Sequence, residues 1–475
     1  MPNFIKSIQA VGIHGRFDLQ QSFDPGVNIL YGKNGAGKTT LLHIIANAVN
    51  GDYPRFLYLN FVRIEIHMDD GTTLEIETKQ PNDEDTDIEI TVKENGERRG
   101  KKFRRQKVED NIETSNIDYK PIATAAYFPA FRSMIEAWLS VKEEDLIRYH
   151  INKNISEIEP LSNKMQEQAT YFSRRLFGQF VPELNYPSPL EIEQRLIDET
   201  REAILAVAKV DRDLLSQSFV EILTAFSSLE TNRSLEPEEI LKQIQSLSET
   251  ILSHPLQDSI FASEMKSKIS EIVNFDRVEY SESKKFIVMI LSVYQEALKK
   301  ISDIQKKSFE SIDQYLASVN EFLEEKELKV SIQERISSQP SVRLMFHNDT
   351  SSSIYTLSSG ERQIITLLYA ATHMSQENII LIDEPEISLH VDWQRLLLKK
   401  MSEQLGNRQI IACTHSPVIP ADYEDNFVEL NVMRTDKSSW YPDPDPDEYT
   451  NQDTITDEDA YLEVDDLAYS EDEFN

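Results

Sequence analysis

The stretch from residue 31 to residue 40 constrains the fold more than any other part of the chain. It reads YGKNGAGKTT, follows a short apolar run at 27–31 and precedes a helical run at 41–49. A strand, a glycine-rich loop and a helix in this order are the context of a phosphate-binding loop. The loop turns its N–H groups inward, and the helix adds the partial positive charge of its N-terminus.

The residue types of this loop predict its contacts. Glycines at 32, 35 and 37 permit backbone angles that a side chain would forbid. Lys38 supplies a full charge for β- and γ-phosphates, and the Thr39 hydroxyl is suited to Mg²⁺. The predicted nucleotide contacts are Asn34, Gly35, Ala36, Gly37, Lys38, Thr39 and Thr40.

The net charge of −33 limits the partners of the chain. An acidic protein repels nucleic acid unless its basic residues are gathered in one place. The only cysteine, Cys413, can form no internal disulfide, which is typical of a reducing compartment. Lys6 and Asp18 interrupt any signal peptide, and no apolar run approaches the about 20 residues that cross a bilayer. We expect a cytoplasmic protein without a membrane partner.

Residues 1–134 are predicted to form the first half of a nucleotide-binding domain. Alternating apolar residues predict strands at 4–8 and 17–23. Further alternating segments between 61 and 92, separated by turns, predict an antiparallel meander. The sequence therefore places an antiparallel β-subdomain beside the phosphate-binding loop.

A basic segment, residues 97–107, ends this meander and contrasts with the acidic remainder. One interpretation is a solvated strand edge whose charges prevent pairing with other chains. The other is a docking site for nucleic acid or for an acidic segment, such as the tail of this chain. The candidate docking residues are Arg98, Arg99, Lys101, Lys102, Arg104 and Arg105.

Residues 135–341 are predicted to be a large helical insertion. This region contains few glycines, and apolar residues recur at helical spacing, so that 284–326 forms one long helix or two. Sustained heptads are weak, and the sequence therefore predicts no long coiled-coil arm.

Residues 342–430 carry three further motifs. The segment LSSGERQ at 357–363 precedes a helix, for which Ser358 or Ser359 is a natural N-cap. The exposed N–H groups at the start of this helix form a second anion site.

Two apolar runs, 378–382 and 409–413, predict buried parallel strands. The first places Asp383 and Glu384 at its carboxyl end, where ligands bind in open α/β sheets. Asp383 is suited to hold Mg²⁺ through water, and Glu384 is suited to polarise the attacking water. The second strand ends near His415, which is placed to donate to a γ-phosphate, although an isolated histidine is more often structural.

These four motifs, in this order, resemble those of ABC-type ATPases of the SMC-like and OLD-like branch. Walker A corresponds to 32–39, the signature LSGGQ to 357–361, Walker B to 379–384, the D-loop to 385–390 and the switch histidine to His415. The resemblance implies an α/β fold: an ABC-type P-loop ATPase head with an antiparallel β-subdomain and a large α-helical insertion.

The resemblance also implies a mechanism with ATP and Mg²⁺ as cofactors. Two heads pair head to tail, or assemble into a higher homo-oligomer, so that each ATP lies between Lys38 of one chain and the signature of another. ATP joins the heads, and hydrolysis loosens them. The implied signature residues are Ser358, Ser359, Gly360 and Glu361, of which Ser359 and Glu361 depart from LSGGQ.

The chain has no clear Q-loop glutamine, and residues 129–132 take that place. Arg132 is therefore a candidate sensor of the nucleotide. An ordinary arginine at the end of a strand is an equally good interpretation.

Residues 431–475 form an acidic tail that we expect to be disordered, and that is too short for the Toprim domain of OLD-family nucleases. The tail is interpreted as a solubilising segment, or as one that binds a partner or inhibits the head.

A head without its own effector resembles the ATPase subunits of prokaryotic anti-phage defence pairs, such as AriA of PARIS or PtuA of Septu. This implies a sensor of a phage protein that controls a separate nuclease. The alternatives are an SMC-like DNA-maintenance ATPase that clamps DNA and a regulatory ATPase with a purely protein partner.

Overall fold

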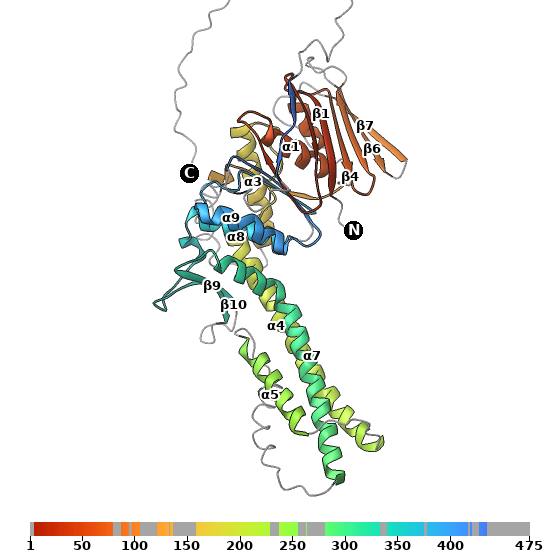
Figure 1. Cartoon of the computed structure of the whole chain (residues 1–475), viewed down its shortest axis with the longest axis vertical. Coiled ribbons are helices and arrows are strands. Elements are labelled where there is room, and N and C mark those ends of the chain that lie inside the picture. Colours follow the sequence, from red (N-terminus) through yellow and green to blue (C-terminus); the bar gives the residue numbers. More distant parts are fainter. Residues whose placement is uncertain are drawn as a thin grey trace, which may run out of the picture.

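The computed structural model describes residues 4–78, 87–94, 97–104, 121–132, 134–135, 158–228, 237–254, 263, 281–332, 340–374, 378–416, 419 and 427–434. These residues form a head with two sheets, from which a long helical arm extends (Figure 1). The predicted α/β head with an antiparallel β-subdomain and a helical region is confirmed.

A parallel five-stranded sheet forms the centre of the head, in the order β14-β3-β13-β12-β8. Its three central strands are apolar and almost wholly buried, as predicted for parallel strands. Strand β13 lies between β3 and β12, so the carboxyl ends of these three strands meet at one edge. The strands are β3 (Val27–Tyr31), β8 (Ala125–Phe128), β12 (Ile379–Asp383), β13 (Gln409–Thr414) and β14 (Phe427–Glu429).

Helix α1 (Lys38–Val49) follows β3 and packs on this sheet with a largely buried apolar face. Helices α8 (Ser359–Thr372) and α9 (Val391–Gln404) pack against each other at the side of the head where the arm begins (Figure 1). Short 3₁₀ turns at Tyr53–Tyr58 and Ile354–Thr356 complete the connections.

The second sheet is antiparallel and has the order β15-β2-β1-β4-β5-β6-β7. The predicted meander is thereby confirmed. Its last member in the chain, β15, lies in the predicted tail, so the expectation of disorder is wrong for these residues, which add an edge strand to β2. The strands are β1 (Ile5–Ile13), β2 (Phe17–Ser22), β4 (Arg63–Met68), β5 (Thr73–Thr78), β6 (Asp87–Glu94), β7 (Glu97–Arg104) and β15 (Val432–Arg434).

The basic segment lies at the opposite edge of this sheet. Among the strands in the described part of the chain, β7 pairs with β6 alone, with Arg98 opposite Lys93 and Lys102 opposite Glu89. Arg99, Lys101 and Arg104 occupy the same strand, whereas Arg105 and the acidic tail beyond Arg434 lie outside the described residues. Residues 97–104 of the segment thus form an edge strand, and the docking role stays a prediction.

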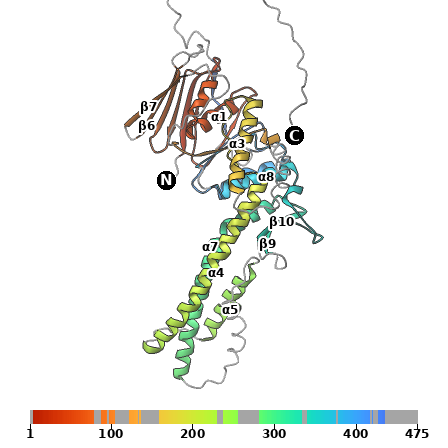
Figure 2. The ribbon, with the colours of Figure 1, turned by 180° about the vertical axis from the view of Figure 1, so that it is seen from behind.

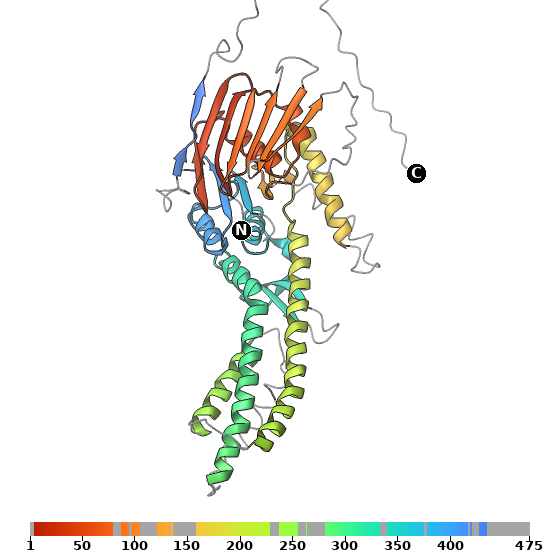
Figure 3. The same cartoon turned by 90° about the vertical axis from the view of Figure 1, so that its right-hand side faces the viewer.

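The arm corrects the prediction of a chain without a long coiled-coil extension. Helices α4 and α7 comprise 40 residues each and run side by side away from the head (Figure 2). Helix α5 packs against α7, and α3 lies alongside the head (Figure 3). No helix within the described ranges is long and apolar enough to span a membrane. The helices are α3 (Ile158–Phe177), α4 (Pro189–Ser228), α5 (Pro237–Ser253) and α7 (Ser281–Asn320).

The arm was not predicted because the buried face of its helix α4 has an unusual sequence pattern. The buried positions of α4 follow one another at intervals of 4, 4, 3, 4, 4, 3 and 4 residues, which is an eleven-residue repeat and not a heptad. Polar or small side chains also occupy half of these positions, which weakens the apolar pattern in the sequence. The buried residues are Ile192, Leu196, Thr200, Ala203, Val207, Asp211, Leu214 and Ser218.

A small antiparallel sheet connects the arm to the signature segment. Strand β9 (Lys326–Ile332) pairs with β10 (Pro340–Phe346), which pairs with β11 (Ser351–Ser352). Strand β9 falls inside the range predicted to be helical, so that prediction is wrong here. Its alternating residues Leu328 and Val330 are buried, which is the period of a strand.

Candidate nucleotide-binding site

The glycine-rich loop leaves β3 and enters α1 as the sequence predicts. Gly35 and Gly37 adopt left-handed backbone angles, with φ of 77° and 89°. A Cβ atom on Gly37 would lie 2.9 Å from Cε2 of Phe17, so both conformation and space require glycine there. Gly32 has no such backbone angle, and the expectation that it would need one is wrong.

The loop lines a cavity of about 800 Å³ at the carboxyl edge of the parallel sheet. All seven predicted loop contacts, from Asn34 to Thr40, line it together with Glu384 and His415. Three further lining residues, His14, Arg16 and Phe17, come from the β1–β2 connection and the first residue of β2, where no sequence motif marks them. Arg16 adds a cationic group and Phe17 an aromatic wall, whereas burial lowers the pKa of His14 and favours its neutral form.

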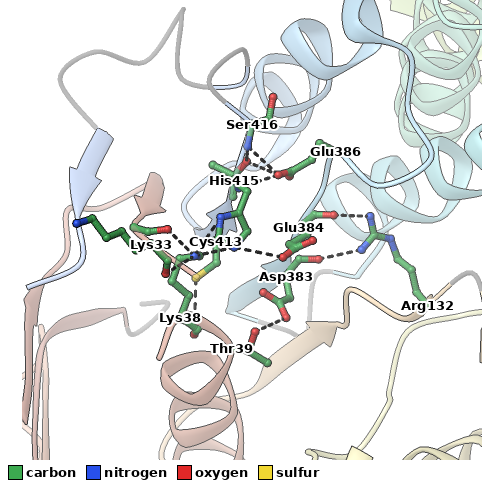
Figure 4. Close-up of polar contacts among 12 residues, drawn as sticks. Lys33, Lys38, Thr39, Arg132, Asp383, Glu384, Glu386, Cys413, His415 and Ser416 are labelled. Atoms are coloured by element: carbon green, nitrogen blue, oxygen red, sulfur yellow. Dashed lines mark hydrogen bonds and ion pairs between the residues drawn. The ribbon is translucent and has the colours of Figure 1, made fainter. Parts of the chain in front are cut away.

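Lys38 is buried and points into the convergence of the three strands (Figure 4). Its ammonium donates to the Gly32 carbonyl at 2.8 Å and lies 2.8 Å from Nε2 of His415. Burial lowers the pKa of Lys38, whereas the charges of Glu384 and Asp383 act in the opposite direction. A bound phosphate would add a full negative charge beside this ammonium.

Asp383 and Thr39 meet on the other side of the loop. The Thr39 hydroxyl donates to Oδ2 of Asp383 at 2.8 Å, and Asp383 is only 2% exposed. Burial raises the pKa of Asp383 to about 6, although the Thr39 hydrogen bond opposes the shift. Oδ1 of Asp383 has no hydrogen-bond partner among the described residues. A hydroxyl beside a buried, incompletely bonded carboxylate fits the oxygen ligands that Mg²⁺ prefers.

Glu384 follows Asp383 with a left-handed backbone, at φ of 49°. This conformation is uncommon for a residue with a side chain and is fixed by a hydrogen bond from its N–H to the Cys413 carbonyl, at 2.8 Å. The carboxylate faces the cavity, with Oε1 lying 3.5 Å from Nε2 of His415 (Figure 4). The turn therefore presents one carboxylate to the sheet edge and the next to the cavity.

Arg132 supports this turn from behind. Its side chain is 1% exposed, and its guanidinium donates to the carbonyls of Pro129, Asp383 and Glu384 at 2.9–3.0 Å. Arg132 is not among the residues that line the cavity. The structure thus favours the interpretation as a strand-end arginine that holds the acidic turn over that of a sensor in contact with the nucleotide.

The signature turn lies apart from this cavity. Ser358 is the N-cap of α8, with its side chain accepting from the Glu361 N–H and its own N–H donating to Glu361 Oε2 at 2.8 Å. Lys326 of β9 neutralises Glu361 at 2.9 Å. Ser358 and Ser359 are exposed, while Gly360 is buried against the Ser388 carbonyl. None of the four signature residues lines the described cavity of its own chain.

A parallel sheet with a phosphate-binding loop, and an acidic pair on a nearby strand, defines a P-loop nucleotide-binding ATPase domain. The chain belongs to the AAA ATPase domain family, whose model matches residues 17–419.

Two relatives carry retron names. Retron Vc95 probable ATPase of Vibrio cholerae serotype O1 biovar El Tor is 28% identical over 176 residues, which cover 32% of this chain and 34% of that protein. Retron Ec83 probable ATPase of Escherichia coli is 30% identical over 84 residues, which cover 15% of this chain and 16% of that protein. The chain thus spans about a third or less of the length of these curated relatives.

Among solved structures, the Smc head domain of Pyrococcus furiosus with an extended coiled coil, bound to the C-terminal domain of ScpA, aligns with this chain. The alignment covers 92% of this chain and 97% of that chain, with 13% sequence identity and a TM-score of 0.34. A TM-score this low carries no argument about the present chain.

Proposed function

We propose that this chain is an ABC-type ATPase of the SMC-like kind, which hydrolyses ATP only when two or more copies pair head to tail. The observation that carries the proposal is that the cavity around Lys38 and the signature turn at 358–361 are two separate features of one chain. None of the residues that line the cavity around Lys38 belongs to the signature, and Ser358 and Ser359 are exposed in the described chain. A second chain would bring the two together.

Within the cavity each side chain has a role that its position supports. Lys38 would bind the β- and γ-phosphates, and Thr39 with Asp383 would hold Mg²⁺, whose charge would neutralise that of the phosphates. Glu384 orients and polarises the attacking water, since its carboxylate faces the cavity beside His415. His415 donates to the γ-phosphate. The ring of Phe17 forms an apolar wall for the nucleotide.

We further propose that this ATPase serves in anti-phage defence as a sensor and scaffold that controls a separate nuclease, with a phage protein as the trigger. The family-level analogy with the ATPase subunits of defence pairs and the retron names of two relatives support this role.

A second candidate function is an ATPase that clamps duplex DNA, which the basic edge strand β7 favours. Filter binding with and without ATP separates the two functions. Tight, salt-sensitive binding of duplex DNA by the wild-type protein, lost on charge reversal at Lys101 and Lys102, would favour the clamp. Absence of such binding would favour control of a protein effector.

The test of the nucleotide site compares Lys38→Ala with Lys33→Ala. Lys33 lies in the same loop, but it is exposed and does not line the cavity. We expect Lys38→Ala to weaken ATP binding by at least about tenfold and to abolish phosphate release, because charged hydrogen bonds are lost. Lys33→Ala should behave as the wild type. Equal ATP binding by both variants and the wild type would show that the cavity is not the site.

A further inference from the structure

Glu386 lies two residues beyond Glu384, and its carboxylate turns toward the end of the neighbouring strand β13. Its Oε1 accepts three hydrogen bonds: from the Thr414 hydroxyl at 2.8 Å, from the His415 N–H at 2.7 Å and from the Ser416 N–H at 2.9 Å (Figure 4). Hydrogen bonds to an ionised acceptor are shorter and stronger than neutral ones. One carboxylate oxygen therefore holds the backbone at and around His415.

The consequence is a fixed direction for the imidazole. His415 itself is exposed and follows the last residue of a strand, where a side chain has few packing constraints. Its Nε2 nevertheless lies 2.8 Å from the Lys38 ammonium and 3.5 Å from Glu384 Oε1. The hydroxyl of Ser416 adds a bond to Gln394 of α9 at 2.8 Å, so the turn is held from two elements.

Helix α8 contacts the backbone on both sides of Glu386. Gln363 of α8 donates to the Pro385 carbonyl at 2.6 Å, and the Ser388 carbonyl packs where Gly360 lacks a side chain. A Cβ atom on Gly360 would lie 2.5 Å from that carbonyl oxygen. The segment 385–388 is therefore a firm support for the Glu386 carboxylate.

We propose that Glu386 is a positioning residue of the ATPase reaction, which acts through the backbone of His415. The inference rests on the proposed function, since His415 has a role in hydrolysis only if the cavity binds ATP. Glu386 does not line the cavity among the described residues, and so it touches no nucleotide. It contributes to turnover by aiming His415, and it contributes little to ATP affinity.

The experiment is a double-mutant cycle of Glu386→Ala with His415→Ala, measured as phosphate release over a range of ATP concentrations. We expect Glu386→Ala to lower kcat by about tenfold to a hundredfold, because the His415 imidazole would be misplaced in the ATPase site. KM and ATP affinity should change less than about threefold. The double variant should be no slower than His415→Ala alone. Glu386→Gln keeps an acceptor oxygen and should retain most of the activity.

The matched control is Glu403→Gln on α9, whose carboxylate pairs with Lys400 at 3.3 Å and does not line the cavity. It should leave kcat unchanged. If Glu386→Ala does not fold, Glu386→Asp takes its place, because it keeps the charge and withdraws the acceptor by one methylene. An unchanged kcat in the folded variant, or losses that multiply in the double variant, would overturn the inference.

A second readout does not need hydrolysis. The side-chain nitrogen signals of His415, assigned by their loss in His415→Ala, should shift in Glu386→Ala and not in Glu403→Gln. If the wild type shows no hydrolysis that depends on Lys38, the proposed function fails, and this shift still decides whether Glu386 orients His415. Unchanged His415 signals would overturn the inference even if the ATPase is confirmed.

Discussion

Two helix N-termini in the head, those of α1 and α8, are predicted to bind the same triphosphate, but the chain prepares them differently. Helix α1 begins after Gly37, with no side-chain cap and no acidic residue in its first turn. Helix α8 begins after Ser358 in a complete capping box closed by Glu361. The first terminus leaves its N–H groups open to an anion, whereas the second already contains its own carboxylate.

We interpret this difference as a division of roles, in which the N-terminus of α1 binds the nucleotide and the N-terminus of α8 takes part in pairing of the heads. The open terminus of α1 sits in a cavity with Lys38 and is suited to bind a nucleotide in a single chain. At α8, burial alone would raise the pKa of Glu361, but hydrogen bonds from Ser358 and Lys326 hold it below its ordinary value. The carboxylate therefore stays charged, and the signature turn keeps its shape without a ligand. In the proposed pair, such a preformed turn would close on a nucleotide that is bound to Lys38 of another chain.

The largest effect should follow from Glu384→Gln, which should leave ATP binding intact but block the hydrolysis that lets the paired heads separate. We expect hydrolysis to fall by about 10²- to 10⁴-fold, because the variant lacks the base, while ATP binding persists. The paired state should then accumulate, as measured by sedimentation with ATP and Mg²⁺. Hydrolysis at the wild-type rate would show that Glu384 is not the base.

A smaller effect should follow from Lys326→Met, which removes the counter-charge of the signature carboxylate. Glu361 would then repel the partner's γ-phosphate, and we expect ATP-dependent association to weaken by about tenfold. Adding Glu361→Gln should restore it, since no charge remains to be neutralised. Lys329→Met, an exposed change on the same strand, is the control. Failure of the double variant to recover would exclude charge balance as the reason.

The smallest effect concerns Asp383, which lies beside the uncapped N-terminus of α1. Its pKa of about 6 exceeds the ordinary value of 3.8, so the folded protein holds this proton more firmly than the unfolded chain does. The stability cost of this buried carboxylate therefore builds up as the pH rises from about 4 to about 6, is complete above pH 6, and disappears as the pH falls back toward 4. Asp383→Asn should raise the unfolding free energy by about 1 kcal/mol at pH 7.5 without Mg²⁺, and not at pH 4. A difference that does not change with pH would contradict the buried charge.

Much of the head was predictable because its signals are local. The strand at 27–31, the loop to Thr40 and the strand before Asp383 each show their period or composition within ten residues. His415 was predicted to lie near them, and the order of the sheet explains why, since β13 separates β3 from β12.

The features that were missed depend on contacts distant in sequence. His14, Arg16 and Phe17 enter the cavity only because the β1–β2 connection folds over the loop; their one local signal is a turn with Gly12 and Gly15. Polar residues in a buried helical seam concealed the arm. The sequence left two interpretations of Arg132 open, and its hydrogen bonds to the Asp383 and Glu384 carbonyls favour the structural one.

The central claim is that one chain's Lys38 and another chain's signature turn form each active site. A mixture of Lys38→Ala with Ser359→Glu, a change at an exposed signature position, tests it most directly. Each variant alone should be inactive. Their equal mixture should recover about a quarter of the wild-type rate, because half of the random pairs are mixed and each mixed pair holds one intact site. Phosphate release that stays at the level of the separate variants, at every mixing ratio, would contradict the account.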